Sequence, residues 1–529
     1  MSETGTIAVP AFAISIGGKP LRDELSRRVI EIRVESHLEL AWSFSIQISD
    51  DRLELIDGDD SPFRLGAEVT ISLGYVNQLR PVIDGRLAAL QPSFPQRGLA
   101  ALTVIGYDRS HPLRHGTRFR QFDGLNDSGI VGEVAKLHTL TAESDGTGLP
   151  TRQTVYHLGT DWELLQALAV RNGFEVFVRE KRLTFKKPEP AGPAVPLTWG
   201  KNLRSFSPRL SACLPQQLDL RDYDDEQKQD VVSSQTVGML KGTFQDDAAR
   251  LPGSSDGGTP FDGQWLARGR SAPTVTEANS LAASILAGLS EGIVSGTGRC
   301  PGDPRLCAGG TVEIRGVGKR CGGVYRLRQV THRYADGGYE TSFEIGPRHS
   351  SSLLDQLRGS LLGTAGAGGS GGESGRMAAL TGTVVDNKDP AGRGRVRVRF
   401  PQLSANNQGP WARIATLAAG DASGTVFLPE VGDDVLVVFE QGDINRPVVV
   451  GGMWNGRSKP PEHNADGKNN VQMIRTRAGH VIKLDNTEGS ESLQLAHPSG
   501  STITMGPKGD VSIEAAGKLT LKGVTVNIN

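Results

Sequence analysis

Four cysteines are the first candidates for chemistry in this chain: Cys213, Cys300, Cys307 and Cys321. Thiolates bind zinc, but the last three are separated by six and thirteen residues, which is not the CxxC spacing of zinc sites. The N-terminus lacks a basic segment followed by an apolar core, so we expect no secretory signal peptide. The four thiols are therefore predicted to be free, without a bound metal.

Four carboxylates could act as a paired general acid and base: Asp421, Glu430, Asp433 and Asp434. They lie near Gly432, and acidic residues beside glycine are typical of tight turns. We therefore interpret these carboxylates as turn residues.

Histidines and arginines offer further alternatives. His111 and His115 could hold a metal, but we expect none there, and His480 is predicted to hydrogen-bond where the C-terminal segment begins. Alternating arginines share one face of a predicted strand, which is either exposed to water or contacts another subunit: Arg393, Arg395, Arg397 and Arg399. Nucleic-acid binding there is disfavoured, because no aromatic residues interleave with the arginines and the formal net charge of the chain is −1.

The element with the most regular pattern is the C-terminal segment, residues 471–529. Apolar and polar residues alternate at a period of two in 502–505, 511–515, 518–522 and 524–529, which predicts half-buried β-strands. A single strand of this kind can neither bury its apolar face nor pair its backbone groups. Several copies of the chain wrapped around one another would satisfy both needs, which predicts a stiff, intertwined β-prism.

The apolar residues of this segment are predicted to stack along the axis of the prism: Ile503, Met505, Val511, Ile513, Leu519, Leu521, Val524, Val526 and Ile528. The Thr, Ser, Lys and Glu residues between them would face water. Gly500, Gly509 and Gly517 are predicted to form the corners, where the backbone needs a positive φ.

Composition restricts the class of protein. The 529 residues allow three or four domains, and 67 glycines with only 5% aromatic residues favour turn-rich β structure. The nearly neutral charge gives no electrostatic argument for nucleic acid or a membrane surface. No apolar run approaches the length of about 18 residues that a transmembrane helix needs.

Two helices are predicted at residues 128–142 and 161–172, with a third near 276–289, between segments that read as strands. Asp127 or Ser128 is expected to cap the first helix and Asp161 the second, and Gly173 should end the second helix.

Residues 352–362 read as a short amphipathic helix and 363–375 as a flexible Gly/Ser linker. After this linker, five or so short strands within about 75 residues fit an OB-type barrel.

The barrel region resembles a known family. The segments GRVRVRFP (394–401), WAR (411–413), FLPEVGDDVLV (427–437) and GDINRPVVVG (442–451) are similar to the OB domain of the VgrG and phage baseplate spike family. RAGHVIKLDNT (477–487) resembles the start of that family's needle.

Upstream segments are similar to the hub of the same proteins, the phage late-control D family: GYDRSHPL (106–113), GTDWELL (159–165) and RNGF (171–174). The similar segments are collinear, and the Gly/Ser linker lies where the family divides hub from spike. The resemblance therefore covers most of the chain.

This resemblance implies a structural protein without enzymatic activity or cofactor, assembled as a homotrimer. Two hub barrels per subunit would form a pseudo-sixfold ring that matches the inner tube of a contractile injection system and contacts baseplate proteins. The OB domain would form a collar, and the C-terminal segment a membrane-puncturing needle that meets the target membrane only on firing. A PAAR-type tip protein would bind the C-terminal end, at Val526, Asn527, Ile528 and Asn529.

The implied fold class is mainly β with minor α: two hub β-barrels with helical inserts, an OB-fold barrel, and an intertwined triple-stranded β-helix in a trimer. The domains would be hub barrel 1 (1–110), a helix-containing hub insert (111–198), hub barrel 2 (199–350), a helix and Gly/Ser-rich linker (351–377), the OB domain (378–456) and the needle (457–529). The protein would be made in the cytoplasm, built into the baseplate, and released or delivered on firing.

Some features depart from the family. Residues 457–470 are too short for the lysozyme that some phage members carry, and no effector domain is expected after the needle. No His-x-His pair follows His497, so no metal is expected in the needle. Chain length favours an extracellular or phage-like system over a type VI system. Two alternatives stay open, an effector-carrying spike with hydrolase activity and a carrier with docked cargo.

Overall fold

The computed structural model describes residues 9–528 apart from 57, 150, 153, 190–191, 211–216, 237–263, 268–270, 292–293, 347–378 and 405–407. The predicted helix at 352–362, the linker at 363–375, Cys213 and Asn529 lie outside the described residues. The chain forms two compact units. The first contains Met1–Ala379, Gln402–Asn406 and Val438–Pro447, and the second contains Leu380–Pro401, Asn407–Val437 and Val448–Asn529.

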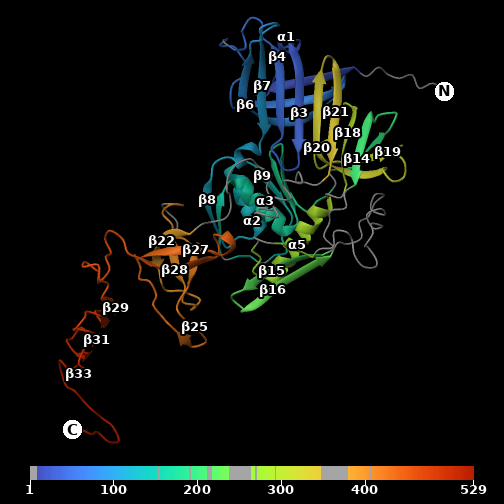
Figure 1. Ribbon diagram of the computed structural model, residues 1–529. Helices are drawn as coiled ribbons and strands as arrows, with labels where there is room; N and C mark the ends of the chain where they lie inside the picture. Colours follow the sequence, from blue (N-terminus) through green and yellow to red (C-terminus); the bar gives the residue numbers. More distant parts are fainter. Residues whose placement is uncertain are drawn as a thin grey trace. The chain divides into compact units, whose positions relative to one another are not determined.

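The first unit contains a 13-stranded sheet (Figure 1). Its N-terminal strands are β1 (Pro10–Ile16), β2 (Lys19–Pro20), β3 (Val29–His37), β4 (Ser43–Ser49), β5 (Glu68–Tyr75), β6 (Gln78–Ser93) and β7 (Ala101–Asp108), with the short helix α1 (Asp23–Ser26). Apolar and polar residues alternate in β4, and this alternation determines its inner face, because Phe44, Ile46 and Ile48 are all buried.

The later strands of this unit are β13 (Val195–Thr198), β14 (Ser205–Leu210), β18 (Val294–Pro301), β19 (Thr311–Arg315), β20 (Gly323–Ala335) and β21 (Gly338–Ile345). They join the N-terminal strands through antiparallel pairing of β20 with β3, in which Gln329 lies opposite His37 and Ala335 opposite Glu31. The two β-rich parts that the sequence indicated thus share one sheet.

Between them lies a helix-containing part: η1 (His111–Arg114), β8 (Arg118–Asp123), α2 (Asp127–Leu137), β9 (Thr141–Ser144), β10 (Thr154–Gly159), α3 (Asp161–Asn172), β11 (Glu175–Arg179) and β12 (Arg182–Lys186). Its helices and strands enclose a separate core that includes Val131, Leu165, Leu183 and Phe185. A small sheet of β15 (Gln217–Asp224), β16 (Gln229–Thr236) and β17 (Gln264–Ala267) packs with helix α5 (Val275–Ser290).

The helix caps differ from the predicted ones. Asn126 caps α2 by accepting a hydrogen bond from the Gly129 amide (2.8 Å), and Thr160 caps α3 in a capping box with Glu163. The predictions of Asp127 or Ser128 for α2 and of Asp161 for α3 were therefore wrong.

Asp127 and Asp161, which do not cap these helices, form ion pairs with arginines instead. Asp161 is the first helical residue of α3 and accepts hydrogen bonds from Arg120 at 2.9 Å. Helix α2 ends at Leu137, earlier than predicted, because Thr141–Ser144 pair with β12 as a strand. Gly173 ends α3 in the left-handed region (φ 67°), as predicted.

A buried ion network joins the three long helices of the first unit. Arg171 on α3 lies 2.6 Å from Asp127 on α2 and 2.6 Å from Glu277 on α5, and Arg152 also binds Glu277 at 2.7 Å. Arg171 and the two carboxylates that it brings together are nearly inaccessible to water. Removing one partner of such a group leaves a buried charge uncompensated.

We expect Arg171→Met to lower the free energy of unfolding by about 3 kcal/mol, because it leaves Asp127 and Glu277 without their shared cation. Lys136→Met is the matched control, since Lys136 forms an exposed pair with Glu133 on α2. Urea denaturation followed by circular dichroism measures both. Equal midpoints for the two variants would contradict the structural role of the network.

Two buried histidines in the first unit are held neutral. Burial lowers the pKa of His332 to about 4, and burial together with Arg328 lowers the pKa of His37 to about 4. His332 donates from Nε2 to the Leu306 carbonyl at 3.0 Å, and its Nδ1 lies 2.9 Å from the Tyr339 hydroxyl. The ordinary pKa of histidine is about 6.5, so the unfolded chain takes up these protons first.

The stability gained from these neutral histidines is complete above about pH 6.5 and is lost as the pH falls towards 4. We therefore expect the melting temperature to fall across this interval, and the fall to be smaller in His332→Gln, which keeps a donor and an acceptor. Differential scanning calorimetry at stepped pH measures this, with the exposed His463→Gln as control. An identical pH profile for His332→Gln and the natural protein would contradict the assignment.

The second unit contains a closed barrel with strand order β22–β23–β24–β28–β27. Its strands are β22 (Leu380–Asp386), β23 (Val396–Arg399), β24 (Trp411–Ile414), β27 (Asp434–Phe439) and β28 (Pro447–Met453), with the hairpin β25 (Ala419–Gly420) and β26 (Ser423–Gly424). The 3-10 turn η3 (Glu440–Gly442) follows β27 and belongs to the first unit. Val384, Val398, Phe400 and Val435 are buried within it. The predicted five-stranded barrel is confirmed.

A sheet of five strands follows the barrel: β29 (Val471–Arg475), β30 (Val481–Asp485), β31 (Ser492–Ala496), β32 (Thr502–Met505) and β33 (Val511–Glu514). Across the described ranges of the chain, no helix is long and apolar enough to cross a membrane.

Candidate functional site

The five C-terminal strands form an antiparallel meander in which each strand pairs with the next along the chain (orange to red in Figure 1). Backbone pairing therefore occurs within one chain here, whereas the sequence predicted pairing between copies. The physical reason lies in the turns, where Gly479, Gly489, Gly500 and Gly509 adopt φ between 76° and 96° and let each hairpin close.

The register of the meander gathers its apolar residues on one face. Ile482 lies opposite Leu495, Leu495 opposite Ile503, and Ile503 opposite Ile513. A parallel row, two residues along each strand, contains Leu484, Leu493, Met505 and Val511, and Ile474 extends the first row. We call these nine residues the apolar face.

The opposite face is polar along its centre, although Val471, Met473 and Val481 also lie on it. Its cross-strand row contains Lys483, Gln494, Thr504 and Ser512. Lys483 also forms an ion pair with Asp485 at 2.9 Å. The meander is thus a thin, two-faced sheet, with one side suited to water and the other suited to burial.

No segment that the structure describes covers the apolar face. Its nine side chains are 37–60% exposed, although they are the large aliphatic types that normally fill cores. Burying apolar surface gains about 25 cal/mol per Å². A contiguous apolar surface of this kind marks an interaction site.

Four of the predicted core residues belong to the apolar face: Ile503, Met505, Val511 and Ile513. The other five, Leu519, Leu521, Val524, Val526 and Ile528, follow the last strand and are exposed. The predicted strands at 518–522 and 524–529 are absent from the described part of this region, residues 515–528.

The backbone conformation at Gly517 accounts for the absence of these strands. Gly517 does not adopt the positive φ predicted for it, unlike Gly500 and Gly509. Without that turn, the chain does not fold back on β33, and the residues beyond have no partner strand.

Sequence reasoning missed five members of the apolar face: Ile474, Ile482, Leu484, Leu493 and Leu495. The same alternation marks them, in Val481–Asp485 and Ser492–Ala496. Extending the period-two pattern N-terminally to residue 481 would have found four of them, whereas Ile474 lies in VQMIR (471–475), where Val471 and Met473 are the alternating apolar residues.

The other candidate residues have structural partners. Asp433 accepts a hydrogen bond from the Glu430 amide at 2.9 Å, and Asp434 accepts from Thr383 and Asn455. Asp421 lies in the tight turn between β25 and β26. These carboxylates therefore organise turns and strand ends.

Two of the alternating arginines at 393–399 have partners within the chain. Arg395 binds Asp389 at 2.9 Å, which holds the pKa of that carboxyl well below its ordinary value, and Arg397 donates to the Gly409 carbonyl at 3.0 Å. The buried Nε of Arg399 has no hydrogen-bond partner.

His480 closes the first turn of the meander, where its amide donates to Thr476 at 3.1 Å. The His111 and His115 rings approach each other, with 2.9 Å between their Nε2 atoms. Cys300, Cys307 and Cys321 are free thiols, and burial raises the pKa of Cys300 to about 12. In the ranges that the structure describes, no three His, Cys, Asp or Glu side chains are grouped so as to hold a metal.

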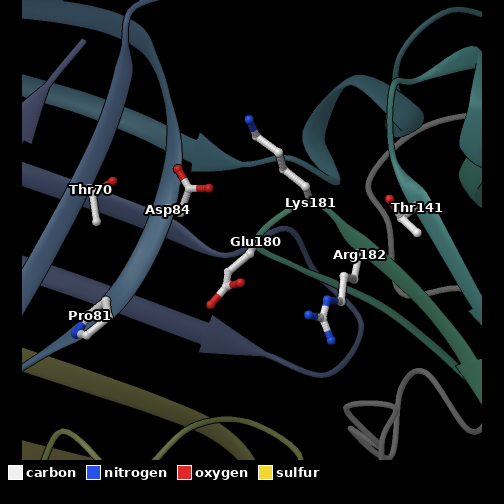
Figure 2. Close-up of a pocket in the computed structure, with 7 residues that line it drawn as sticks. All are labelled: Thr70, Pro81, Asp84, Thr141, Glu180, Lys181 and Arg182. Carbon is white, nitrogen blue, oxygen red and sulfur yellow. The ribbon is translucent and has the colours of Figure 1, made fainter. Parts of the chain in front are cut away.

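Figure 2 shows a cavity of about 420 Å³ in the first unit, between the strands β5 and β6 and the turn that joins β11 to β12. Its lining residues are Thr70, Pro81, Asp84, Thr141, Glu180, Lys181 and Arg182. Asp84 is already bound by Arg109 at 3.1 Å. The charges of the lining are mixed, so the cavity does not favour one class of ligand.

Comparison with known proteins identifies both units. Residues 380–454 match the type VI secretion system/phage-baseplate injector OB domain, and residues 6–336 match the Alg8 N-terminal domain. The second match covers more than half of the chain. The chain belongs to the Alg8 N-terminal domain family. The OB domain of the second unit is the kind found in type VI secretion system and phage-baseplate injector proteins.

Curated relatives match this chain over a short stretch. The type VI secretion system spike protein VgrG1a of Pseudomonas aeruginosa is 28% identical over 113 residues, which are 19% of this chain and 18% of VgrG1a. The actin cross-linking toxin VgrG1 of Vibrio cholerae is 26% identical over 110 residues, 19% of this chain and 10% of the toxin. The chain therefore spans less than a fifth of these relatives.

The fold of one solved structure is similar over a larger part of the chain. A chain of the Francisella PdpA–VgrG complex superposes with a TM-score of 0.56 at 6% identity, over 97% of this chain and 81% of that one.

If the apolar face is the site of association, a charge placed on it should prevent assembly. We expect Ile503→Lys to reduce the solution mass of the protein, because a lysine in a buried sheet face has no partner. Thr504→Lys is the matched control, one residue away on the polar face. Light scattering measures the mass, and equal masses for the two variants would show that the face is not buried by association.

Proposed function

We propose that this chain is the central hub and spike of a contractile injection system, extracellular, phage-like or type VI, and that it works as a homotrimer. The observation that carries this proposal is the uncovered apolar face of β29–β33. Family membership and the injector OB domain support the same function.

Three copies of the meander would bury their apolar faces against one another around a common axis. Within each copy the five strands already pair their backbone groups with one another. Association therefore adds the burial of side chains to a preformed sheet. The polar rows with Thr504 and Ser512 would then face outward. The product is a narrow rod with a packed core, which is suited to transmitting axial force through a membrane.

The predicted core residues Leu519, Leu521, Val524, Val526 and Ile528 would continue this core beyond β33. They are exposed in a single chain, and three copies side by side would offer each of them a partner. Val526, Asn527, Ile528 and Asn529 would then present the end of the rod to a PAAR-type tip protein.

The large first unit would serve as the hub, in contact with inner tube and baseplate proteins. Its continuous sheet and its buried ion network favour a stiff platform. We propose a structural role for this chain and not catalysis. Assembly would take place in the cytoplasm, and the target membrane would be contacted only on firing.

The solution mass of the purified chain tests the trimer. For the full-length protein we expect three times the 56.4 kDa mass of one chain. After removal of residues 471–529 we expect the mass of a single truncated chain. A folded, monomeric full-length protein would contradict the proposal. Zymography on cell-wall substrate tests the structural role, since hydrolysis by the pure protein would favour an effector-carrying spike.

A further inference from the structure

Two histidines of the first unit hold their ring nitrogens face to face. The Nε2 atoms of His111 and His115 are 2.9 Å apart, and the ring centroids are 4.2 Å apart. At this distance one Nε2 donates a hydrogen bond to the other, so both nitrogens point into the same small space. Imidazole nitrogens are common ligands of transition metals. The pair lies outside the C-terminal strands on which the proposed function rests.

The turn that carries the two histidines is anchored by three contacts. Leu113 lies between them, is fully buried, and belongs to the core of the helix-containing part. The Tyr107 ring stacks on the His111 ring, with centroids 4.3 Å apart and planes within 2° of parallel. Arg118 donates to the His115 carbonyl at 3.1 Å. The two rings are thus held near one geometry before any ligand binds, which reduces the entropy lost on binding.

The separation of the two nitrogens, 2.9 Å, favours one coordination geometry. A metal ion about 2.0 Å from each Nε2 would make an angle of about 90° with them. This is the angle between neighbouring ligands in square-planar and octahedral complexes, which Cu²⁺ and Ni²⁺ form with nitrogen ligands. A tetrahedral Zn²⁺ ion would need nitrogens about 3.3 Å apart. The distance in the structure therefore favours Cu²⁺ or Ni²⁺ over Zn²⁺.

The three arginines closest in sequence to the pair are already engaged. Arg109 binds Asp84 at 3.1 Å, and Arg118 lies 3.3 Å from the buried Asp161. The guanidinium of Arg114 stacks over an indole ring at 3.8 Å. Two of the three positive charges are thus neutralised by carboxylates, and the third lies against an aromatic ring, which reduces the repulsion of a bound cation.

We propose that His111 and His115 together bind one Cu²⁺ or Ni²⁺ ion through their Nε2 atoms. The proton that the two nitrogens share moves to Nδ1 of its own ring, so both imidazoles stay neutral and each offers one lone pair. Among the residues that the structure describes, no third His, Cys, Asp or Glu side chain completes a metal site with them, so water fills the remaining positions. The ion links the two ends of η1, between β7 and β8.

This inference differs from the expectation drawn from the sequence, which was that no metal binds at this pair. Residue spacing does not reveal the distance between the two nitrogens, because the fold of the turn and the stacking of Tyr107 set it.

Titration of the full-length protein with Cu²⁺, followed by calorimetry and electron paramagnetic resonance, tests the site. We expect His111→Gln and His115→Gln each to weaken Cu²⁺ binding about tenfold or more, because a single imidazole loses the chelate. His463→Gln is the matched control, since His463 is an exposed histidine of the second unit, and should leave the binding unchanged. The resonance spectrum of the natural protein should show two nitrogen ligands, and that of either variant at most one.

Equal Cu²⁺ affinity in the natural protein and in both variants would assign the ion to other surface histidines and overturn the site. Circular dichroism of each variant checks that a loss of binding is not a loss of fold.

Thermal unfolding provides an independent measurement, because an ion that binds only the folded protein raises the melting temperature. We expect Ni²⁺ to raise the melting temperature of the natural protein and of His463→Gln, by more than Zn²⁺ does, and to leave His111→Gln and His115→Gln unchanged. A similar rise in all four proteins would overturn the proposal. Neither result depends on whether the chain forms a trimer, so the metal site can fail while the proposed function stands.

Discussion

The apolar face of β29–β33 is the constraint on which the assembly of this protein depends. Inside one chain the strands pair their backbone groups, yet the large aliphatic side chains on one side of the sheet stay in water. A two-faced sheet whose apolar side is exposed to water carries a free-energy cost that grows with the exposed apolar area. Association with identical sheets removes that cost and at the same time produces a rod.

The rest of the molecule serves a different purpose. The first unit stabilises itself through its own cores and through the Arg171 network, so it does not need association to bury its interior. The barrel of the second unit is likewise closed on itself.

Sequence patterns predicted the elements well where side-chain period decides the structure. The alternation at Phe44, Ile46 and Ile48 predicted a strand with one buried face, and the spacing at 161–172 predicted helix α3 with its end at Gly173. The caps were predicted wrongly at both helices, because a carboxylate at the first helical position and a cap one residue earlier look alike in sequence. Buried arginine partners decided between them.

The sequence by itself determined the β-rich class, the five-stranded barrel and the alternating needle, since these follow from local periodicity and turn residues. Tertiary structure decided three further matters: that β3 and β20 join both β-rich parts in one sheet, that the needle strands pair within a chain, and that residues 515–528 do not form strands in it. Each of these depends on which distant segments can reach one another and on backbone angles at single glycines such as Gly517. Neither quantity is encoded in a local pattern.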